Sequence, residues 1–415
     1  MKMLRLSPYY APERISSTHL TDDLEMAYAN AGFLTEIYVP TPTRGISKEE
    51  WETYRKIKYE EKYDGSLHVH RFSMFREGHN PIGRAIRYML VNLIQYHKGI
   101  RAKDITLITG GSTPPTQGVL CSLVAKKLSK KYKRPVPFVF NLQDMFPESL
   151  ASTGLAKKGS LLYRIGEKIS DFTYRNATEI MVISHNMKNA LIAKGVPAEK
   201  ITVIYNWIDT ESTIPVKRED NPLFDELGLD RNQFYITYAG NLGNSQNVDI
   251  LIDCANALKD KEDIHFVVFG GGSEKDKFEK KITESGLSNI RLLPLQPMER
   301  VSQVYSLGNA SFVTCKKGVG VGAFPSKAVT IMATGTPIIA SFDLDSDLCK
   351  ILEENKAGLC AEAEDVLGAI EAILTLYNNR ALQQMYGNNA RRLACDHFSK
   401  EAGTAAKVGL FKKYE

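Results

Sequence analysis

The sequence predicts an α/β protein built from two Rossmann-like, doubly wound domains that face a central cleft. Short Val- and Ile-rich segments alternate with helical segments of about a dozen residues in two successive series, as in the βαβ units of a parallel sheet. A polar stretch with two prolines and several acids, residues 206–230, separates the two series. The chain has 415 residues, 43% hydrophobic and 24% charged, so it can form two domains with cores of their own.

The first series predicts an N-terminal domain over residues 1–205. Residues 3–10 are expected to form a strand and the loop after it, and further strands are expected at 35–40, 66–73, 104–111, 137–144, 179–184 and 201–206. Helices are expected at 17–32, 116–132, 161–177 and 185–195.

The second series follows the linker at 206–230 and predicts a C-terminal domain over residues 231–390. Strands are expected at 234–241, 264–272, 290–296, 310–316 and 336–342. Helices are expected at 248–260, 274–286, 300–308, 326–335, 365–379, 381–398 and 400–415. We expect the last helices, within 391–415, to pack back on the N-terminal domain.

Charge and cysteine content exclude several classes of protein. The formal net charge is +5, from 53 Lys and Arg against 48 Asp and Glu, and no nucleic-acid partner is expected. The six cysteines are scattered without a C-x-x-C pair, which is typical of reduced cytosolic thiols and excludes a disulfide or zinc framework. No segment reaches the ~18–20 apolar residues that span a bilayer, and no signal peptide is apparent. A cytoplasmic protein without a metal site is expected.

Ligands of open α/β sheets bind beyond the carboxyl ends of the strands, so the loops after the strands are the candidate sites. Gly270, Gly271 and Gly272 follow one strand of the second series and would let backbone amides approach a phosphate. The alternative is a tight strand-to-helix turn. Gly240 and Gly243 follow another strand, where Asn241 and Gln246 could donate hydrogen bonds to phosphate oxygens.

The loop from 315 to 325 carries three glycines, including Gly322, and ends in Pro325 before a predicted helix. We expect Ser326 to be the N-cap of that helix, with Lys327 in its first turn. A cation works against the helix dipole there unless an anion shares the site, so Lys327 is the main candidate for binding a diphosphate, with Lys316 and Lys317 nearby. The alternative for the latter two is solvated loop charge.

In the first half, Gln143, Asp144 and Glu148 follow the apolar strand at 137–142. A carboxylate there can orient a hydroxyl group or take its proton, or it can cap the next turn. Further acceptor-side candidates are Gly111 and Ser112 in a Gly- and Pro-rich loop, and Glu13 and Arg14 after the first strand.

Taken together, these motifs resemble family-four retaining glycosyltransferases, which have the GT-B fold. Segments 201–209, 238–258, 266–294 and 324–341 are similar to the C-terminal half of that family in order and spacing. Segments 9–13, 111–116, 137–149 and 177–206 resemble its bacterial O-antigen and capsule branch. The resemblance covers nearly the whole chain.

The sequence departs from the family pattern at four positions of the donor site. Gly322 and Thr330 occupy the positions of a glutamate pair whose second member binds the donor's ribose in many members. Asn241 and Gln246 replace the Arg and Lys of the usual diphosphate loop. The phosphate charge is therefore expected to fall on Lys327 and Lys316. The common histidine of the N-terminal domain is also missing, and Asp144 or Gln143 lies nearest its position.

The resemblance implies transfer of a sugar from a nucleotide-sugar, commonly uridine-linked, to a lipid-linked saccharide in cell-surface polysaccharide synthesis. It implies retention at the anomeric carbon, no cofactor and no metal, with Lys327 and Asp144 as catalytic residues. Two alternatives stay open: a nucleotide-sugar epimerase of the same architecture, and a non-catalytic partner of a polysaccharide enzyme.

One more segment, residues 80–103, carries an apolar stripe at helical spacing: Ile82, Ile86, Met89, Leu90, Leu93 and Ile94. Arg84, Arg87, Gln95 and Lys98 lie on another face. The pattern favours an ordinary helix that packs its apolar face on a sheet and turns a basic face to solvent. The alternative is peripheral contact with an anionic membrane.

Overall fold

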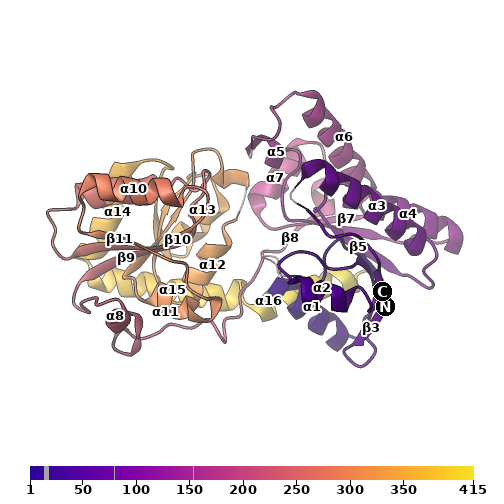
Figure 1. Cartoon of the computed structure of the whole chain (residues 1–415), viewed down its shortest axis with the longest axis horizontal. Helices are drawn as coiled ribbons and strands as arrows, with labels where there is room; N and C mark the ends of the chain where they lie inside the picture. The colour runs from indigo at the N-terminus through magenta and orange to yellow at the C-terminus, as the bar shows by residue number, and fades with distance from the viewer. Residues whose placement is uncertain (14–17, 79, 153, 323) are drawn as a thin grey trace. The chain divides into compact units, whose positions relative to one another are not determined.

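The computed structural model describes residues 1–13, 18–78, 80–152, 154–322 and 324–415. The chain divides into two compact units, Met1–Tyr205 with Thr404–Glu415, and Asn206–Gly403. Each unit contains a mainly parallel sheet with helices on both faces, and the two sheets are the Rossmann-like sheets of the GT-B fold (Figure 1). Among the described residues, no helix is both long and apolar enough to cross a membrane.

The first unit contains an eight-stranded sheet whose strands are parallel except for the antiparallel pair β3–β4. In spatial order the strands are β3 (Tyr59–Lys62), β4 (Leu67–Phe72), β2 (Leu34–Pro40), β1 (Lys2–Leu6), β5 (Leu107–Gly111), β6 (Phe138–Leu142), β7 (Glu179–Val182) and β8 (Ile201–Val203). Its helices are α1 (Thr18–Asn30), α2 (Lys48–Tyr54), α3 (Pro81–Gly99), α4 (Gln117–Tyr132), α5 (Glu148–Ser152), α6 (Leu161–Asn176) and α7 (His185–Ala193). Apolar side chains of the strands, such as Leu4, Ile108 and Phe138, are buried between the layers.

Besides the five-residue α5, two elements of this unit, α2 and β3, were not predicted. Neither buries enough apolar surface to leave a periodic signal, because α2 has no buried residue and β3, with the sequence YEEK, is an edge strand. A capping box fixes the start of α2: the Ser47 side chain accepts a bond from the Glu50 amide, and the Glu50 side chain accepts one from the Ser47 amide.

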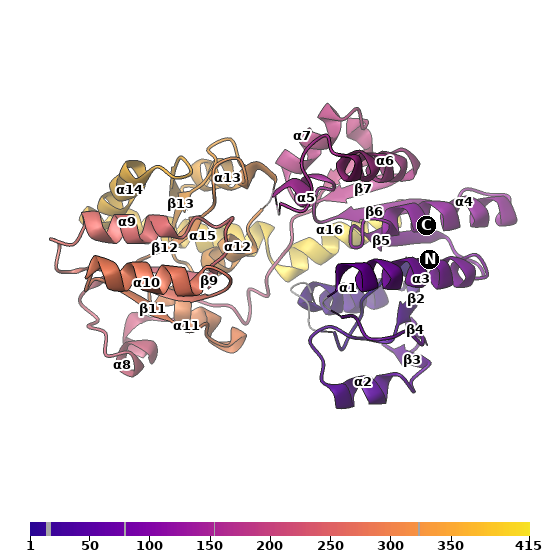
Figure 2. The same ribbon diagram turned by 45° about the horizontal axis from the view of Figure 1, so that its top comes forward.

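The second unit contains a six-stranded, all-parallel sheet. In spatial order the strands are β11 (Ile290–Leu293), β10 (Ile264–Gly271), β9 (Phe234–Asn241), β12 (Ala310–Thr314), β13 (Ile338–Ser341) and β14 (Gly358–Ala361). Its helices are α8 (Leu223–Glu226), α9 (Asp249–Ala257), α10 (Lys275–Ser285), α11 (Val301–Ser306), α12 (Ser326–Ala333), α13 (Asp347–Glu354), α14 (Val366–Asn378) and α15 (Arg380–His397). Figure 2 shows α9 and α10 side by side on one face, and α12 packs on α15. The helix α13 and the four-residue strand β14 were not predicted from the sequence.

The last helix, α16 (Lys400–Lys412), contributes residues from Thr404 onward to the first unit. There the Phe411 ring stacks on Tyr28 of α1 at 5.3 Å between centroids, and the Tyr414 hydroxyl donates to Glu179 on β7 at 2.6 Å. Aromatic packing, this charge-assisted hydrogen bond and the 3.7 Å contact of Glu415 with the Met1 ammonium thus hold the end of the chain.

The expected packing of α3 is wrong. Of its apolar stripe, Ile82, Ile86, Met89, Leu90 and Leu93 are exposed. Arg87 and Gln95, which were expected on a solvent-facing side, are instead fully buried. The reason is polar: the Gln95 side-chain amide donates to the carbonyls of Ser7 and Tyr38, and the Arg87 guanidinium donates to those of Phe75 and Thr41. These carbonyls, one within β2 and three in the loops that follow β1, β2 and β4, need donors, and the two side chains supply them.

Candidate functional site

The most distinctive polar group of the second unit is the Lys327 ammonium. Lys327 is the second residue of α12, and its side chain extends to β9. Its Nζ donates to the Tyr238 hydroxyl at 2.9 Å and lies 4.1 Å from the centroid of the Tyr238 ring. The Tyr238 hydroxyl in turn donates to the Asn241 carbonyl at 2.8 Å. This chain of contacts holds the ammonium at the carboxyl end of β9, where ligands of such sheets bind.

Burial makes this ammonium a receptive group for an anion. Loss of hydration lowers the pKa of Lys327 from 10.5 to about 8. Among the described residues, no carboxylate forms an ion pair with it, and its polar partner is a neutral hydroxyl. A diphosphate would supply the missing negative charge, so the geometry favours an anionic ligand here.

Gly240 makes room for the Lys327 ammonium. A Cβ atom at Gly240 would lie 3.0 Å from the Lys327 Nζ, and its φ of +144° disfavours a side chain. Gly243 sits between two amide side chains, since its Cβ would lie 2.6 Å from both Asn241 Nδ2 and Gln246 Oε1. Four predicted donor residues, Gly240, Asn241, Gly243 and Gln246, are therefore close together, and Lys327 joins them.

The glycines after β10 have a structural explanation of their own. A Cβ at Gly270 would overlap the Leu242 side chain, and one at Gly272, whose φ is +143°, would overlap Asn241 and the Leu242 carbonyl. A Cβ at Gly271 would approach Leu295 at 3.3 Å. Gly270 and Gly272 are therefore explained by the alternative reading, a tight strand-to-helix turn, because any side chain there would collide with the β9–α9 loop.

The loop before α12 differs from the expected phosphate cradle. The amides of Gly318 and Gly320 donate to the two carboxylate oxygens of the buried Asp343, both at 2.8 Å. These two amides therefore already have an acceptor within the protein, the carboxylate of Asp343 after β13, and they are not free to bind a phosphate. Gly322 ends a short 3₁₀ turn, Gly320–Gly322, and is exposed.

Helix α12 begins one residue earlier than expected, because Pro325 and not Ser326 is its N-cap, and this N-cap makes no side-chain capping bond. Ser326 is thus the first helical residue, and its carbonyl accepts a bond from the buried Thr330 hydroxyl at 3.4 Å. The Lys316 ammonium donates to Asn244 Oδ1 at 2.5 Å, and that of Lys317 lies 3.6 Å from Glu362. Lys317 is thus a solvated loop charge, which is the alternative stated for it above.

In the first unit, the candidates after β5 and β6 lie next to one another. The Ser112 hydroxyl, one residue beyond Gly111, accepts a bond from the Gln143 amide at 3.2 Å. Asp144 follows directly, and burial raises the pKa of its carboxyl group, although the side chain remains exposed, so solvent limits the rise. Glu148 begins α5 and pairs with Lys194 at 2.5 Å.

Glu13 serves a different purpose from the others. It is 2% exposed, and its carboxylate accepts bonds from the amides of Tyr10, Thr43 and Arg44 at 2.9, 2.7 and 3.1 Å. Burial raises its pKa and these three bonds lower it. Glu13 therefore joins the loops after β1 and β2, and it can affect an acceptor only by holding them. Arg14 lies outside the described residues.

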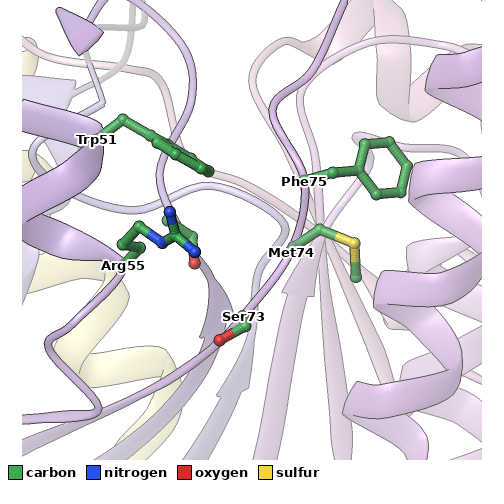
Figure 3. Close-up of a pocket in the computed structure, with 6 residues that line it drawn as sticks. Trp51, Arg55, Ser73, Met74 and Phe75 are labelled. Carbon is green, nitrogen blue, oxygen red and sulfur yellow. The ribbon is translucent and has the colours of Figure 1, made fainter.

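A hollow of about 340 Å³ in the first unit was missed by the sequence analysis. It is lined by Thr41, Trp51, Arg55, Ser73, Met74 and Phe75. Figure 3 shows Trp51 and Arg55, from α2 and its C-cap, on one side and the Ser73–Phe75 segment on the other. The Arg55 guanidinium carbon lies 4.9 Å from the Trp51 ring centroid. The spacing of Trp51 and Arg55, four residues apart, could have predicted their contact, because residues at this spacing are neighbours on a helix. That prediction would have required α2 to be recognised as a helix.

Tyr238 and Asp343 were also missed as site residues. In the sequence, Tyr238 cannot be distinguished from the other apolar residues of a buried strand. Its contact with Lys327 could not be predicted because the two residues are 89 positions apart. Within the described ranges, no cluster of three or more His, Cys, Asp or Glu side chains could hold a metal ion.

Two family models match the chain. Residues 21–212 match Glycosyltransferase Family 4, and residues 219–393 match Glycosyl transferases group 1. Among curated proteins, WcaI of Escherichia coli, named as a glycosyl transferase of colanic acid biosynthesis, is 28% identical over 272 residues, covering 63% of this chain and 64% of WcaI. WbjE of Pseudomonas aeruginosa, named as a glycosyltransferase, is 27% identical over 259 residues, covering 62% of each. The chain thus spans somewhat less than two thirds of the length of these relatives.

Solved structures show the same fold over the full length. The sucrose-phosphate synthase of Thermosynechococcus elongatus superposes with a TM-score of 0.72 at 15% identity, covering 100% of this chain and 99% of that one. Anabaena HepE in complex with UDP superposes with a TM-score of 0.71 at 17% identity, covering all of both chains. At these identities the likeness concerns the fold.

Proposed function

The chain belongs to the glycosyltransferases of the GT-B fold, and on this basis we propose that it transfers a sugar from a nucleotide-sugar to a lipid-linked saccharide. The donor is a uridine diphosphate sugar, as the UDP complex of HepE suggests by analogy. The product takes part in cell-surface polysaccharide synthesis, for which the name of WcaI is the support. The anomeric configuration is retained.

The observation that carries this proposal is the desolvated Lys327 ammonium at the end of β9, in the half that matches Glycosyl transferases group 1. When the donor binds, a diphosphate oxygen replaces the Tyr238 hydroxyl as the partner of Nζ. As the glycosidic bond breaks, negative charge grows on the leaving diphosphate, and a fixed cation in a site of low polarity stabilises it. In this proposal a metal ion is not needed for that charge.

Asp144 is proposed for the acceptor. It follows β6 in the half that matches Glycosyltransferase Family 4, and its carboxylate is exposed. An exposed carboxylate with a raised pKa can orient an acceptor hydroxyl and accept its proton as the new glycosidic bond forms.

A donor screen followed by a turnover assay tests the proposal. A nucleotide-sugar present at 100 times its dissociation constant should stabilise the protein by about 2.7 kcal/mol, which thermal denaturation detects. The stabilising donor is then supplied in labelled form with membrane lipid extract. Transfer of label to lipid with release of UDP supports the proposal. Conversion of the donor to its epimer would establish the isomerase alternative, and binding without turnover would establish the non-catalytic one.

A further inference from the structure

Helix α3 turns its apolar side to solvent and its polar side to the protein. The exposed fraction is 71% for Ile82, 67% for Met89 and 54% for Leu93, with Ile86 and Leu90 between them on the same stripe. The buried stripe includes Arg87 and Gln95, both at 0%. A surface helix ordinarily does the reverse, because burying apolar groups is what stabilises it on the sheet.

The exposed apolar surface continues on the two neighbouring helices. α3 packs on α4, and α4 packs on α6, so their outward sides form one surface of the first unit. Large apolar side chains exposed on α4, on α6 and just before α6 are Leu123, Leu155, Leu161, Leu162 and Ile165. Together with α3, this surface holds ten of the twenty exposed large apolar side chains of the described residues. Apolar patches of this extent mark interaction sites.

The charge of the same surface is strongly positive. Residues 81–99, 117–132 and 154–176 contain twelve Lys and Arg, of which Arg87 is buried, against two acidic residues. Their surplus is ten, whereas the whole chain has a net charge of +5. Several of these cations are exposed: Lys126, Lys127, Lys130, Lys131, Lys157, Lys158, Arg164 and Lys168. The rest of the chain is therefore net negative, and the positive charge gathers around the apolar side chains.

We propose that the outer face of α3, α4 and α6 binds the surface of an anionic lipid bilayer. Its apolar side chains enter the boundary between headgroups and acyl chains, and its lysines contact lipid phosphates. A second copy of the chain fits this face poorly, because two surfaces with the same surplus of positive charge repel each other. This binding goes beyond sugar transfer and does not depend on it.

The test is co-sedimentation of the full chain with vesicles of phosphatidylcholine, with and without phosphatidylglycerol, in the absence of donor. Binding is expected only to the anionic vesicles, and it should weaken as salt is raised. Replacing Ile86, Met89 and Leu93 by Ser should reduce the partition coefficient by at least about tenfold, since these side chains lose their burial in lipid. Their exposure means that the same substitutions cost the free protein little stability.

A charge variant and two matched controls complete the design. Lys127→Glu with Lys130→Glu should weaken binding by at least about 25-fold, since each cation contributes about fivefold. The controls lie in the second unit: Leu295→Ser, Met298→Ser and Leu367→Ser for apolar exposure, and Lys277→Glu with Lys280→Glu for charge. Both controls should bind vesicles as the native chain does.

Three outcomes would overturn the proposal. The first is equal binding to neutral and anionic vesicles, and the second is an equal loss of binding in the control variants. The third is a native dimer in light scattering that the α3 serine variant converts to a monomer, which would make the face an interface between copies. Because no donor is present, none of these outcomes bears on sugar transfer.

Discussion

Replacement of Lys327 by Met separates the binding of the donor from the stability of the fold. The substitution keeps the length of the side chain and removes its charge. A lost charge-assisted hydrogen bond to the diphosphate should cost about 1.5–3 kcal/mol, which weakens UDP binding about 10- to 150-fold. Isothermal titration with UDP measures this change directly.

The stability of the same variant should stay level or rise. A pKa of about 8 in place of 10.5 means that burying the charged ammonium costs about 3 kcal/mol, at about 1.4 kcal/mol per pH unit. The methionine avoids this cost but loses the hydrogen bond to Tyr238, worth about 1 kcal/mol, and the cation–π contact, worth about 0.5–2 kcal/mol. The opposing contributions nearly cancel, so thermal denaturation should show no loss.

The pH dependence follows from the direction of the pKa shift. The lysine is charged in the native protein below about pH 8, so UDP affinity should fall as the pH rises through 8, and binding near pH 8 should take up protons. The unfolded chain keeps this lysine protonated up to about pH 10.5. Its contribution to stability therefore improves as the pH rises from 8 to 10.5 and is lost as the pH falls through that range. The methionine variant should show neither effect.

Lys317→Met is the matched control, because it removes an exposed, surface-paired cation from the same loop. It should bind UDP as the native chain does. The reasoning is refuted if Lys327→Met binds UDP at native strength, or if native and variant affinities fall in parallel across pH 8.

Two further predictions concern the first unit. Asp144→Asn should lower turnover while UDP affinity stays native, since the proposed donor site lies in the other unit. A loss of UDP affinity with turnover otherwise retained would contradict the acceptor role proposed for Asp144. Glu13→Ala should lower the free energy of unfolding by about 1–3 kcal/mol in urea titration, because it leaves two buried amides and the half-buried amide of Arg44 without their acceptor. Native stability with impaired use of the acceptor would instead favour a direct acceptor role for Glu13.

The sequence alone determined the α/β class and the positions of most strands and helices. These depend on local patterns, because a buried parallel strand is a short apolar run and a covering helix repeats its apolar residues along the chain. Elements that bury little, such as α2 and β3, lack that pattern and were missed. The loops after the strands were also predictable, and with them Lys327, because a strand end and a helix start are both visible in the sequence.

Only the tertiary structure decided what each polar group contacts. The Lys327 ammonium donates to the Tyr238 hydroxyl, which is 89 residues away in the sequence. The Asp343 carboxylate accepts bonds from the amides of Gly318 and Gly320, which are 25 and 23 residues away. The orientation of α3 is the clearest case. Its sequence has an apolar stripe and a polar stripe, and burial of the apolar one is the usual result. Here backbone carbonyls of β2 and of the loops after β1, β2 and β4 bind Arg87 and Gln95, so the polar stripe faces inward and the apolar stripe faces out. Periodicity defines the two faces of a helix, but the groups that the rest of the fold presents to it decide which face is buried.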